Sequence, residues 1–247
     1  MDTVLLAADT STTRGSIGLK IADSRVMERP LPEGLPHSET LLPAILELLT
    51  SSGLGPEDVT ALAIGVGPGA FTGLRVGLST FKGLAFTSQL PVAPVSSLDA
   101  VAYPFLLEGQ RAIVAADARK GEIYVAGYSG ITPEGLPGRD CEISLLPHHA
   151  FSQFIMNCPD GERIVAGTGL AMIRGTVDST PYLTPAGDDM AYPRASFILE
   201  IGRKLLDVGR SVTSFELVPF YVRPPDAAPH RGMAPPVNDN PRGNRRS

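Results

Sequence analysis

The chain has 247 residues, enough for one large domain or two small ones, and its 43% hydrophobic and 19% charged residues are ordinary for a globular protein. A net charge of −5 gives no overall positive field for nucleic acid or an anionic membrane, and no apolar run reaches the ~20 residues of a membrane span. The two cysteines, Cys141 and Cys158, lack a C-x-x-C spacing. We therefore expect neither a disulfide framework nor a zinc site, and such cysteines suit a reducing, cytoplasmic compartment.

The chain opens with predicted strands and then a helix. Residues 4–8 are apolar with no basic segment ahead of them, which is typical of a strand rather than a signal peptide. With residues 16–21 they predict a hairpin that has a polar tip, and a third strand is expected at about 25–29. Leucine spacing predicts a helix from about Ser38, its expected cap, to Ser52, and this helix is apolar on more than one side.

A strand, a glycine-rich loop and a helix form the unit around which the rest of the chain is organised. Residues 61–64 are apolar, a loop with Gly67 and Gly69 follows, and helical spacing continues from Thr72, the expected cap, to Phe86. Such a unit leaves free backbone N–H groups that can hold an anion or another backbone. The loop also fits the dinucleotide-binding pattern, but the acidic residue expected about 20 positions later is missing.

A strand at 92–95 and a helix at 97–107 complete the first half, and the second half begins by repeating the first. Residues 112–126 again give an apolar strand, an Ala-Asp pair, a polar turn with glycine and an apolar strand. Asp117 therefore corresponds to Asp9. This repeat predicts a duplicated α/β fold whose two lobes are related.

Later segments carry weaker patterns. Residues 130–140 are typical of a proline- and glycine-rich loop, 164–169 of a strand that runs into a glycine turn, and 192–208 of a helix. The tail at 224–247 has the proline-rich, apolar-poor composition of a disordered segment. We expect the helix at about 192–208 to pack back on the first lobe. The predicted lobes are 1–108 and a smaller one at 109–223.

Polar residues at the tip of the first hairpin are candidates for holding a metal-bound phosphate. Hydroxyls and backbone amides in a tight turn suit phosphate oxygens, and the carboxylate of Asp9 suits Mg²⁺. The same residue types also satisfy a turn by themselves, and the sequence leaves both interpretations open. With the glycines of the central loop, the candidate nucleotide-binding residues are Asp9, Thr10, Ser11, Thr12, Gly67 and Gly69.

Catalytic and metal-binding motifs are missing from the sequence. None of the four histidines shares a predicted helix with a second histidine or a carboxylate at the i, i+4 spacing of a helical metal site. No G-x-S-x-G nucleophile elbow is present either. We therefore expect no metal and no catalytic residue.

Segments spread along the chain resemble the TsaB (YeaZ) family. The central segment, GPGAFTGLRVGLSTFKGLA at 67–85, is similar to the family signature and is highly specific. The other matching segments are LAADTST at 6–12, HSETLLPAI at 37–45, SSLDAVA at 96–102, DARKGEIYVAGY at 117–128 and PFYVR at 219–223. The resemblance covers residues 4 to 223 and leaves out the tail.

The resemblance implies an actin-like (ASKHA, ribonuclease H-like) fold and a role in threonylcarbamoyl transfer to adenosine 37 of tRNAs that read ANN codons. TsaB is similar to the catalytic relative TsaD and works as its partner, together with the ATPase TsaE. It forms a homodimer when TsaD is absent, and its contact with tRNA is indirect. No cofactor is implied for TsaB itself.

One departure from TsaD bears on activity. In TsaD the strand after the central helix leads into an H-x-x-x-H metal pair, whereas here residues 92–95 are followed by Ser96 and Ser97. Serine hydroxyls do not replace imidazoles as ligands of a transition metal. The resemblance together with this departure implies a non-catalytic scaffold.

Two helices are the expected docking face. In the TsaB family the helices that correspond to 38–52 and 72–86 pair with TsaD or with a second TsaB. The extra apolar surface of the first helix fits this role, and two glycines four residues apart leave a strip on the second where another backbone can approach. Alternatively, that strip packs only on the chain's own sheet. The expected interface residues are Leu41, Leu42, Ile45, Phe71, Gly73, Arg75, Gly77, Leu78 and Lys82.

Two other classes of function stay open at this point. One is a small-molecule kinase or ATPase of the actin-like class, which ATP turnover by the isolated protein would favour. The other is a peptidase, an activity of which the broader family has been suspected. A peptidase requires a catalytic dyad, and the sequence shows none.

Overall fold

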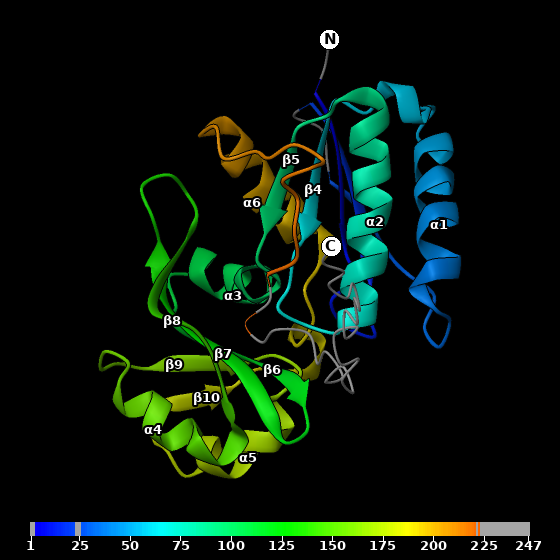
Figure 1. Ribbon diagram of the computed structural model, residues 1–247. Coiled ribbons are helices and arrows are strands. Elements are labelled where there is room, and N and C mark those ends of the chain that lie inside the picture. Colours follow the sequence, from blue (N-terminus) through cyan, green and yellow to red (C-terminus); the bar gives the residue numbers. More distant parts are fainter. Residues whose placement is uncertain (1–2, 23–25, 221, 223–247) are drawn as a thin grey trace, which may run out of the picture.

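The structure is a computed structural model that describes residues 3–22, 26–220 and 222, and the tail predicted at 224–247 lies outside them. The described residues form two five-stranded sheets (Figure 1). The strands of the first sheet are β1 (Val4–Asp9), β2 (Ser16–Ile21), β3 (Met27–Pro30), β4 (Ala61–Gly65) and β5 (Val92–Val95). Those of the second are β6 (Ala112–Arg119), β7 (Glu122–Ile131), β8 (Pro137–Pro147), β9 (Arg163–Ala166) and β10 (Leu183–Pro185).

The two sheets share one topology. The first has the order β3-β2-β1-β4-β5, and the second has the matching order β8-β7-β6-β9-β10. In each sheet the first three strands pair antiparallel, and the last two add on in parallel. Asp9 and Asp117 each accept a hydrogen bond from the backbone N–H two residues later, at 2.8 and 2.7 Å. The predicted duplicated α/β fold is confirmed.

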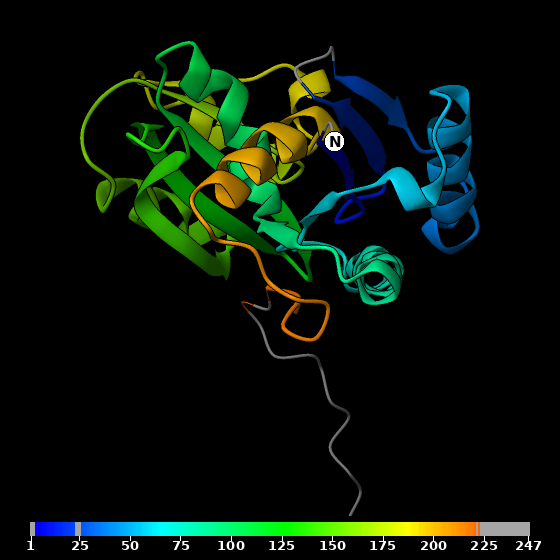
Figure 2. The ribbon, with the colours of Figure 1, turned by 90° about the horizontal axis from the view of Figure 1, so that it is seen from above.

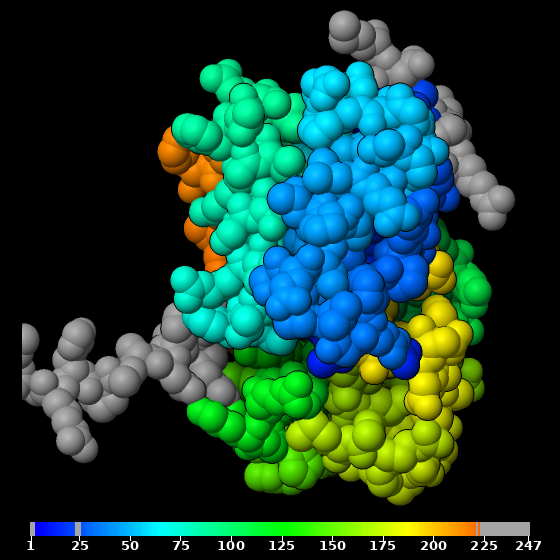
Figure 3. Space-filling view, turned by 90° about the vertical axis from the view of Figure 1, so that its right-hand side faces the viewer, coloured from blue at the N-terminus to red at the C-terminus, as the bar shows by residue number. Residues whose placement is uncertain are grey.

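Helices cover both faces of the first sheet (Figure 2). The helices are α1 (His37–Ser51), α2 (Phe71–Ser88), α3 (Ser97–Leu107), α4 (Phe151–Met156), α5 (Leu170–Asp178) and α6 (Ala195–Asp207). Leu6 and Ala8 of β1 join the core under α1 and α2, whereas Leu5 and Ala7 join the core under α6. A strand buried on both faces reads as a continuous apolar run, as β1 does. On the outside, α1 and α2 lie side by side along one face of the molecule (Figure 3).

Helix α3 lies between the two sheets. Its Ala100 and Tyr103 belong to the core that contains α6, and its Val101 and Phe105 belong to the core of β6 and β7. Helices α4 and α5 pack on the other face of the second sheet. The boundary predicted at residue 108 falls directly after α3, and the division into two lobes stays a prediction. Within the described ranges no helix combines the length and the apolar character needed to cross a bilayer.

Three expectations about local structure are wrong. Helix α1 begins at His37 with Pro36 in the cap position, and α2 begins at Phe71 with Ala70 there, so neither Ser38 nor Thr72 is the cap. The N–H of Ala70 bonds to the carbonyl of Ser11 at 2.7 Å, which fixes the chain directly before Phe71, where α2 begins. The third error concerns residues 130–140, which were expected to form a loop. They form the end of β7, a hairpin turn and the start of β8. Their prolines and glycines lie at the turn and near register shifts between the two strands, and for this reason they imitate a longer loop.

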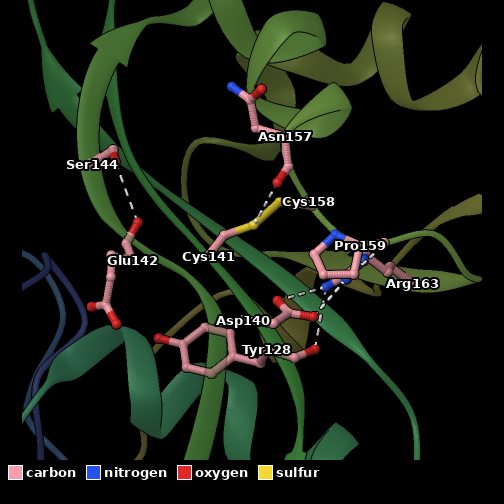
Figure 4. Close-up of a disulfide and its surroundings, with 9 residues drawn as sticks. All are labelled: Tyr128, Asp140, Cys141, Glu142, Ser144, Asn157, Cys158, Pro159 and Arg163. Atoms are coloured by element: carbon pink, nitrogen blue, oxygen red, sulfur yellow. Dashed lines mark hydrogen bonds and ion pairs between the residues drawn. A yellow bond between two sulfur atoms is a disulfide. The ribbon is translucent and has the colours of Figure 1, made fainter.

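The missed strand β8 also explains why the two cysteines meet. Cys141 of β8 and Cys158, which follows α4, form a disulfide with their Cα atoms 5.8 Å apart (Figure 4). The expectation of no disulfide is therefore wrong. Beside it, the Arg163 guanidinium pairs with the Asp140 carboxylate at 2.6 Å and donates to the Pro159 carbonyl at 2.8 Å. Together these bonds tie β8 to β9 and to the segment between α4 and β9.

We expect Asp140→Ala to lower the free energy of unfolding by about 3–5 kcal/mol, because it leaves a buried cation without its partner. The Arg163 side chain is only 1% exposed. Asp178→Ala is the matched control, since it breaks the exposed Arg174–Asp178 pair of α5 and should change stability by less than about 0.5 kcal/mol. Urea unfolding of the three proteins measures both. Equal losses for the two variants would show that the buried pair does not hold the second sheet.

Candidate functional site

Asp9 ends β1 where β4 and the start of α3 come together. Its Oδ1 accepts hydrogen bonds from the backbone N–H of Ser11 at 2.8 Å and the Ser11 hydroxyl at 2.7 Å. Its Oδ2 accepts one from the Ser97 hydroxyl at 2.6 Å. Gly65 of β4 makes room for the carboxylate, since a Cβ there would lie 1.9 Å from Oδ2. The carboxylate is fully buried, and both of its oxygens bond within the fold.

Burial raises the pKa of Asp9 above the ordinary value, and the hydrogen bonds from Ser97 and Ser11 offset only part of this. A raised pKa means that the folded chain holds this proton more tightly than the unfolded chain does. The stability that Asp9 contributes is therefore fully present below pH 3.8, the ordinary pKa, and is lost as the pH rises through the folded pKa.

Asp9→Asn removes this titration and supplies the measurement. The free energy of unfolding of the wild-type chain, taken relative to that of Asp9→Asn, should fall as the pH rises above 3.8. Urea unfolding of both proteins at a series of pH values measures this difference. A difference that grows with pH would contradict the raised pKa of Asp9.

The glycine loop before α2 packs on the tip of the first hairpin. The N–H of Gly67 donates to the Ser97 hydroxyl at 3.2 Å. A Cβ at Gly69 would lie 2.4 Å from the Ser11 carbonyl oxygen, so the two backbones touch. The Thr10 hydroxyl donates to the carbonyl of Gly73 at 2.9 Å, which links the tip to α2.

The structure therefore brings the predicted nucleotide-binding residues together as one packed contact. Asp9, Thr10, Ser11 and Gly67 are buried, whereas Thr12 and Gly69 are partly exposed. In the second sheet the Asp117 side chain is 30% exposed and lies beside the guanidinium of its neighbour Arg119. The two matching hairpins thus differ in burial: Asp9 is fully buried, whereas Asp117 is partly exposed.

Two residues of this region were missed by sequence reasoning. In the sequence Ser97 was noted only because it follows the strand after which TsaD has its metal-binding histidines. Its hydroxyl in fact donates a hydrogen bond to Asp9 and accepts one from the N–H of Gly67. The His37 ring lies over the hairpin tip, and its Nε2 is 2.8 Å from the Thr12 carbonyl, to which it donates. Over the described part of the chain, no three His, Cys, Asp or Glu side chains gather as a metal site would require.

The predicted docking residues divide by burial. Leu42, Phe71 and Arg75 are exposed, and Lys82 is partly exposed. The Arg75 guanidinium lies 5.3 Å from the centre of the Phe71 ring, in cation–π contact. Phe71 and Arg75 line a shallow groove that runs along α2 beside Ser38 of α1.

The remaining predicted docking residues are occupied within the chain. Leu41, Ile45 and Leu78 are at most 4% exposed and belong to the core between the helices and the first sheet. The apolar stripe of α1 faces the sheet through these positions, which leaves Leu42 and Leu46 outside. A Cβ at Gly73 would lie 2.0 Å from the Thr10 carbonyl oxygen, and one at Gly77 would lie 2.3 Å from the Thr10 hydroxyl oxygen. The glycine strip therefore packs on the chain's own hairpin, and the expectation that these five residues reach a partner is corrected.

Similarity to known sequences agrees with this architecture. The family model described as "TsaD: tRNA N6-adenosine threonylcarbamoyltransferase" matches residues 33–134, which run from α1 to the end of β7. Two sheets of one topology together with a TsaD-type first half define an α/β protein of the actin-like class.

Relatives that match most of the chain identify the family. A protein of Haemophilus influenzae named tRNA threonylcarbamoyladenosine biosynthesis protein TsaB is 34% identical, over 89% of this chain and 93% of that protein. The TsaB of Escherichia coli is 31% identical, over 76% of this chain and 80% of its own. The solved structure of YeaZ from Pseudomonas aeruginosa is 30% identical with a TM-score of 0.73, over 89% of this chain and 99% of that one. The chain belongs to the TsaB family of tRNA threonylcarbamoyladenosine biosynthesis proteins.

Proposed function

We propose that this chain is a non-catalytic subunit for threonylcarbamoyl transfer to adenosine 37 of tRNAs that read ANN codons. It pairs with TsaD, the catalytic relative, and recruits the ATPase TsaE, while tRNA is contacted through these partners. Without TsaD the same surface pairs two copies of the chain. The exposed apolar surface of α1 and α2 carries the proposal.

The exposed apolar surface of α1 and α2 suits a partner that packs its own helices against these two helices. Leu42 and Leu46 on α1 and Phe71 on α2 are each more than 40% exposed, and the two helices lie side by side (Figure 3). Apolar side chains gathered on one face of a monomer usually mark an interaction site. Arg75 and Lys82 on α2 supply a polar border, as interfaces of this type commonly have.

The packing around Asp9 supports the non-catalytic assignment. A bound phosphate needs free backbone N–H groups and open space at the glycine loop. Here the N–H of Gly67 bonds to Ser97, the N–H of Ala70 bonds to Ser11, and Gly69 touches the same Ser11 carbonyl. These two N–H groups already bond within the fold, so we assign the six nucleotide-type residues a structural role.

Reconstitution tests the proposal. Unmodified tRNA, a threonylcarbamoyl donor, ATP, TsaD and TsaE are incubated with or without this chain, and the modified nucleoside is measured by mass spectrometry. We expect product only when the chain and TsaD are both present, and neither product nor ATP turnover from the chain alone. ATP turnover by the isolated chain would favour the kinase or ATPase alternative. Undiminished product without the chain would overturn the role of a required subunit.

A further inference from the structure

The two helices of the α1–α2 face carry charges of opposite sign. Within its bounds α1 has two acidic residues, Glu39 and Glu47, and no lysine or arginine. Helix α2 has two basic residues, Arg75 and Lys82, and no aspartate or glutamate. Glu39, Glu47 and Arg75 are exposed, and Lys82 is partly exposed. Because the helices lie side by side, the face is negative along one helix and positive along the other (Figure 3).

The acidic residues of α1 border its exposed apolar surface. Leu42 and Leu46 lie between Glu39 and Glu47 along the helix and are 46% and 42% exposed. Glu39 and Leu42, three residues apart, are neighbours on the helix surface. Glu47 bonds to Arg29 of β3 at 2.9 Å, yet its side chain is 76% exposed and can reach a second cation. A partner that covers the two leucines is therefore favoured if it brings basic groups beside them.

The start of α1 lies level with Arg75 of α2. Ser38 and Arg75 line the same shallow groove. Nearer the other ends of the two helices, Leu46 and Leu84 line a second hollow. The helices therefore run side by side in the same direction, and Glu39, the residue after Ser38, lies at the height of Arg75.

The spacing of the charges matches between the helices. Arg75 and Lys82 are seven residues apart, about 10 Å along the helix axis, and Glu39 and Glu47 are eight residues apart, about 12 Å. Because Glu39 is level with Arg75, Glu47 is level with Lys82 to within about one helical turn. Each acidic residue of α1 thus has a basic counterpart at its height on α2.

Symmetry limits the ways in which two copies can pair through this face. Identical faces that pair in a closed dimer are related by a two-fold axis. An axis across the helices lays each helix on its own counterpart, with acid against acid and base against base. An axis along the helices lays α1 of each copy on α2 of the other and keeps the heights, so that opposite charges meet. Like charges apposed across an interface are unfavourable, and complementary charges fix the register.

We propose that two copies of this chain pair about an axis along the helices, with α1 of each copy on α2 of the other. Arg75 then lies beside Glu39 of the other copy, and Lys82 lies beside Glu47. The occupant of the face is a second copy because the chain itself supplies the complementary charges at matching heights. This arrangement rests on the proposed function in one respect, the pairing of two copies through the α1–α2 face.

Charge reversal tests the arrangement by sedimentation velocity of the full chain. Arg75→Glu puts a glutamate beside Glu39 at two places in the dimer, and Glu39→Arg puts an arginine beside Arg75 at two places. Both positions are exposed, so the fold should tolerate the changes. The dissociation constant of the dimer should rise about tenfold or more in each variant. An equimolar mixture of the two variants should dimerise as tightly as the wild type, because both contacts of the mixed dimer join an arginine to a glutamate.

Arg174→Glu is the control, because Arg174 is exposed on α5, which packs on the second sheet. Its self-association should match that of the wild type. Equal weakening by Arg174→Glu and Arg75→Glu would trace the effect to overall charge and overturn the arrangement. A mixture that fails to dimerise, single variants that dimerise as tightly as the wild type, or a wild-type chain that stays monomeric would overturn it as well.

The proposed function has separate readouts. Formation of the modified nucleoside in the reconstituted reaction does not require that two copies of this chain pair. Self-association of Leu42→Glu reports the use of the face without its orientation. If Leu42→Glu is monomeric and the mixture of charge variants fails to pair, the α1–α2 face stands and the placement of α1 on α2 falls.

Discussion

Leu42→Glu should weaken binding of the chain to TsaD by about a hundredfold or more. Leu42 is 46% exposed on the outer side of α1, so the glutamate is solvated in the free chain and does not disturb its fold. In a helix–helix interface the carboxylate would be buried without a partner, which costs about 3–5 kcal/mol. At about 1.4 kcal/mol for each tenfold change in affinity, this loss corresponds to the stated effect. Calorimetric titration of TsaD with the variant measures it.

The matched control for this variant is Leu107→Glu. Leu107 ends α3, is 59% exposed and lies away from α1 and α2, so the same substitution should leave binding to TsaD unchanged. Both variants should unfold at the same temperature as the wild type. Wild-type affinity in Leu42→Glu, or equal weakening by the control, would move the docking face to another surface.

The self-association of the chain should follow the same pattern. If two copies pair through the α1–α2 face, Leu42→Glu sediments as a monomer at concentrations where the wild type and Leu107→Glu sediment as dimers. Sedimentation velocity without TsaD measures this directly. A variant that stays dimeric would show that the homodimer uses a different surface from the one we propose for TsaD.

Strong local patterns allowed much of the first sheet and its helices to be predicted from sequence. The apolar run of β1, the change from strand to helical spacing around the glycine loop, and the Asp9–Asp117 repeat each reflect one local rule. The second sheet was harder to predict. Strand β8 has register shifts opposite β7, and its prolines and glycines imitate a loop. Missing β8 meant missing the disulfide, because only the strand brings Cys141 to Cys158.

The candidate site shows a different limit. Sequence identified Asp9 and the glycine loop, but not that they bond to each other through Ser11 and Ser97, which are 2 and 88 positions away from Asp9. On α1, apolar residues around more than one side predicted an exposed surface without saying which leucines form it. Rotation of the helix against the sheet decides this, and it buries Leu41 while exposing its neighbour Leu42.

Substitution of the glycines of α2 tests whether the strip formed by Gly73 and Gly77 packs on the chain's own hairpin. Gly73→Ala should lower the free energy of unfolding of the isolated chain by about 1–3 kcal/mol, because overpacking forces neighbouring groups apart. The new Cβ would lie 2.0 Å from the Thr10 carbonyl oxygen, and a backbone atom cannot rotate away. Gly77→Ala should be milder, since its nearest contact is the Thr10 hydroxyl at 2.3 Å, on a side chain that can turn.

Gly83→Ala is the control within the same helix and should have the opposite sign. Nothing lies within 4 Å of a Cβ at Gly83, so alanine meets open space there and raises the stability of the helix by up to about 1 kcal/mol. Urea unfolding of the three variants gives both signs in one experiment. If Gly73→Ala stabilised the chain as Gly83→Ala does, the hairpin tip would not close over the strip in solution. The glycine strip would then be free for a partner, as the sequence alone had allowed.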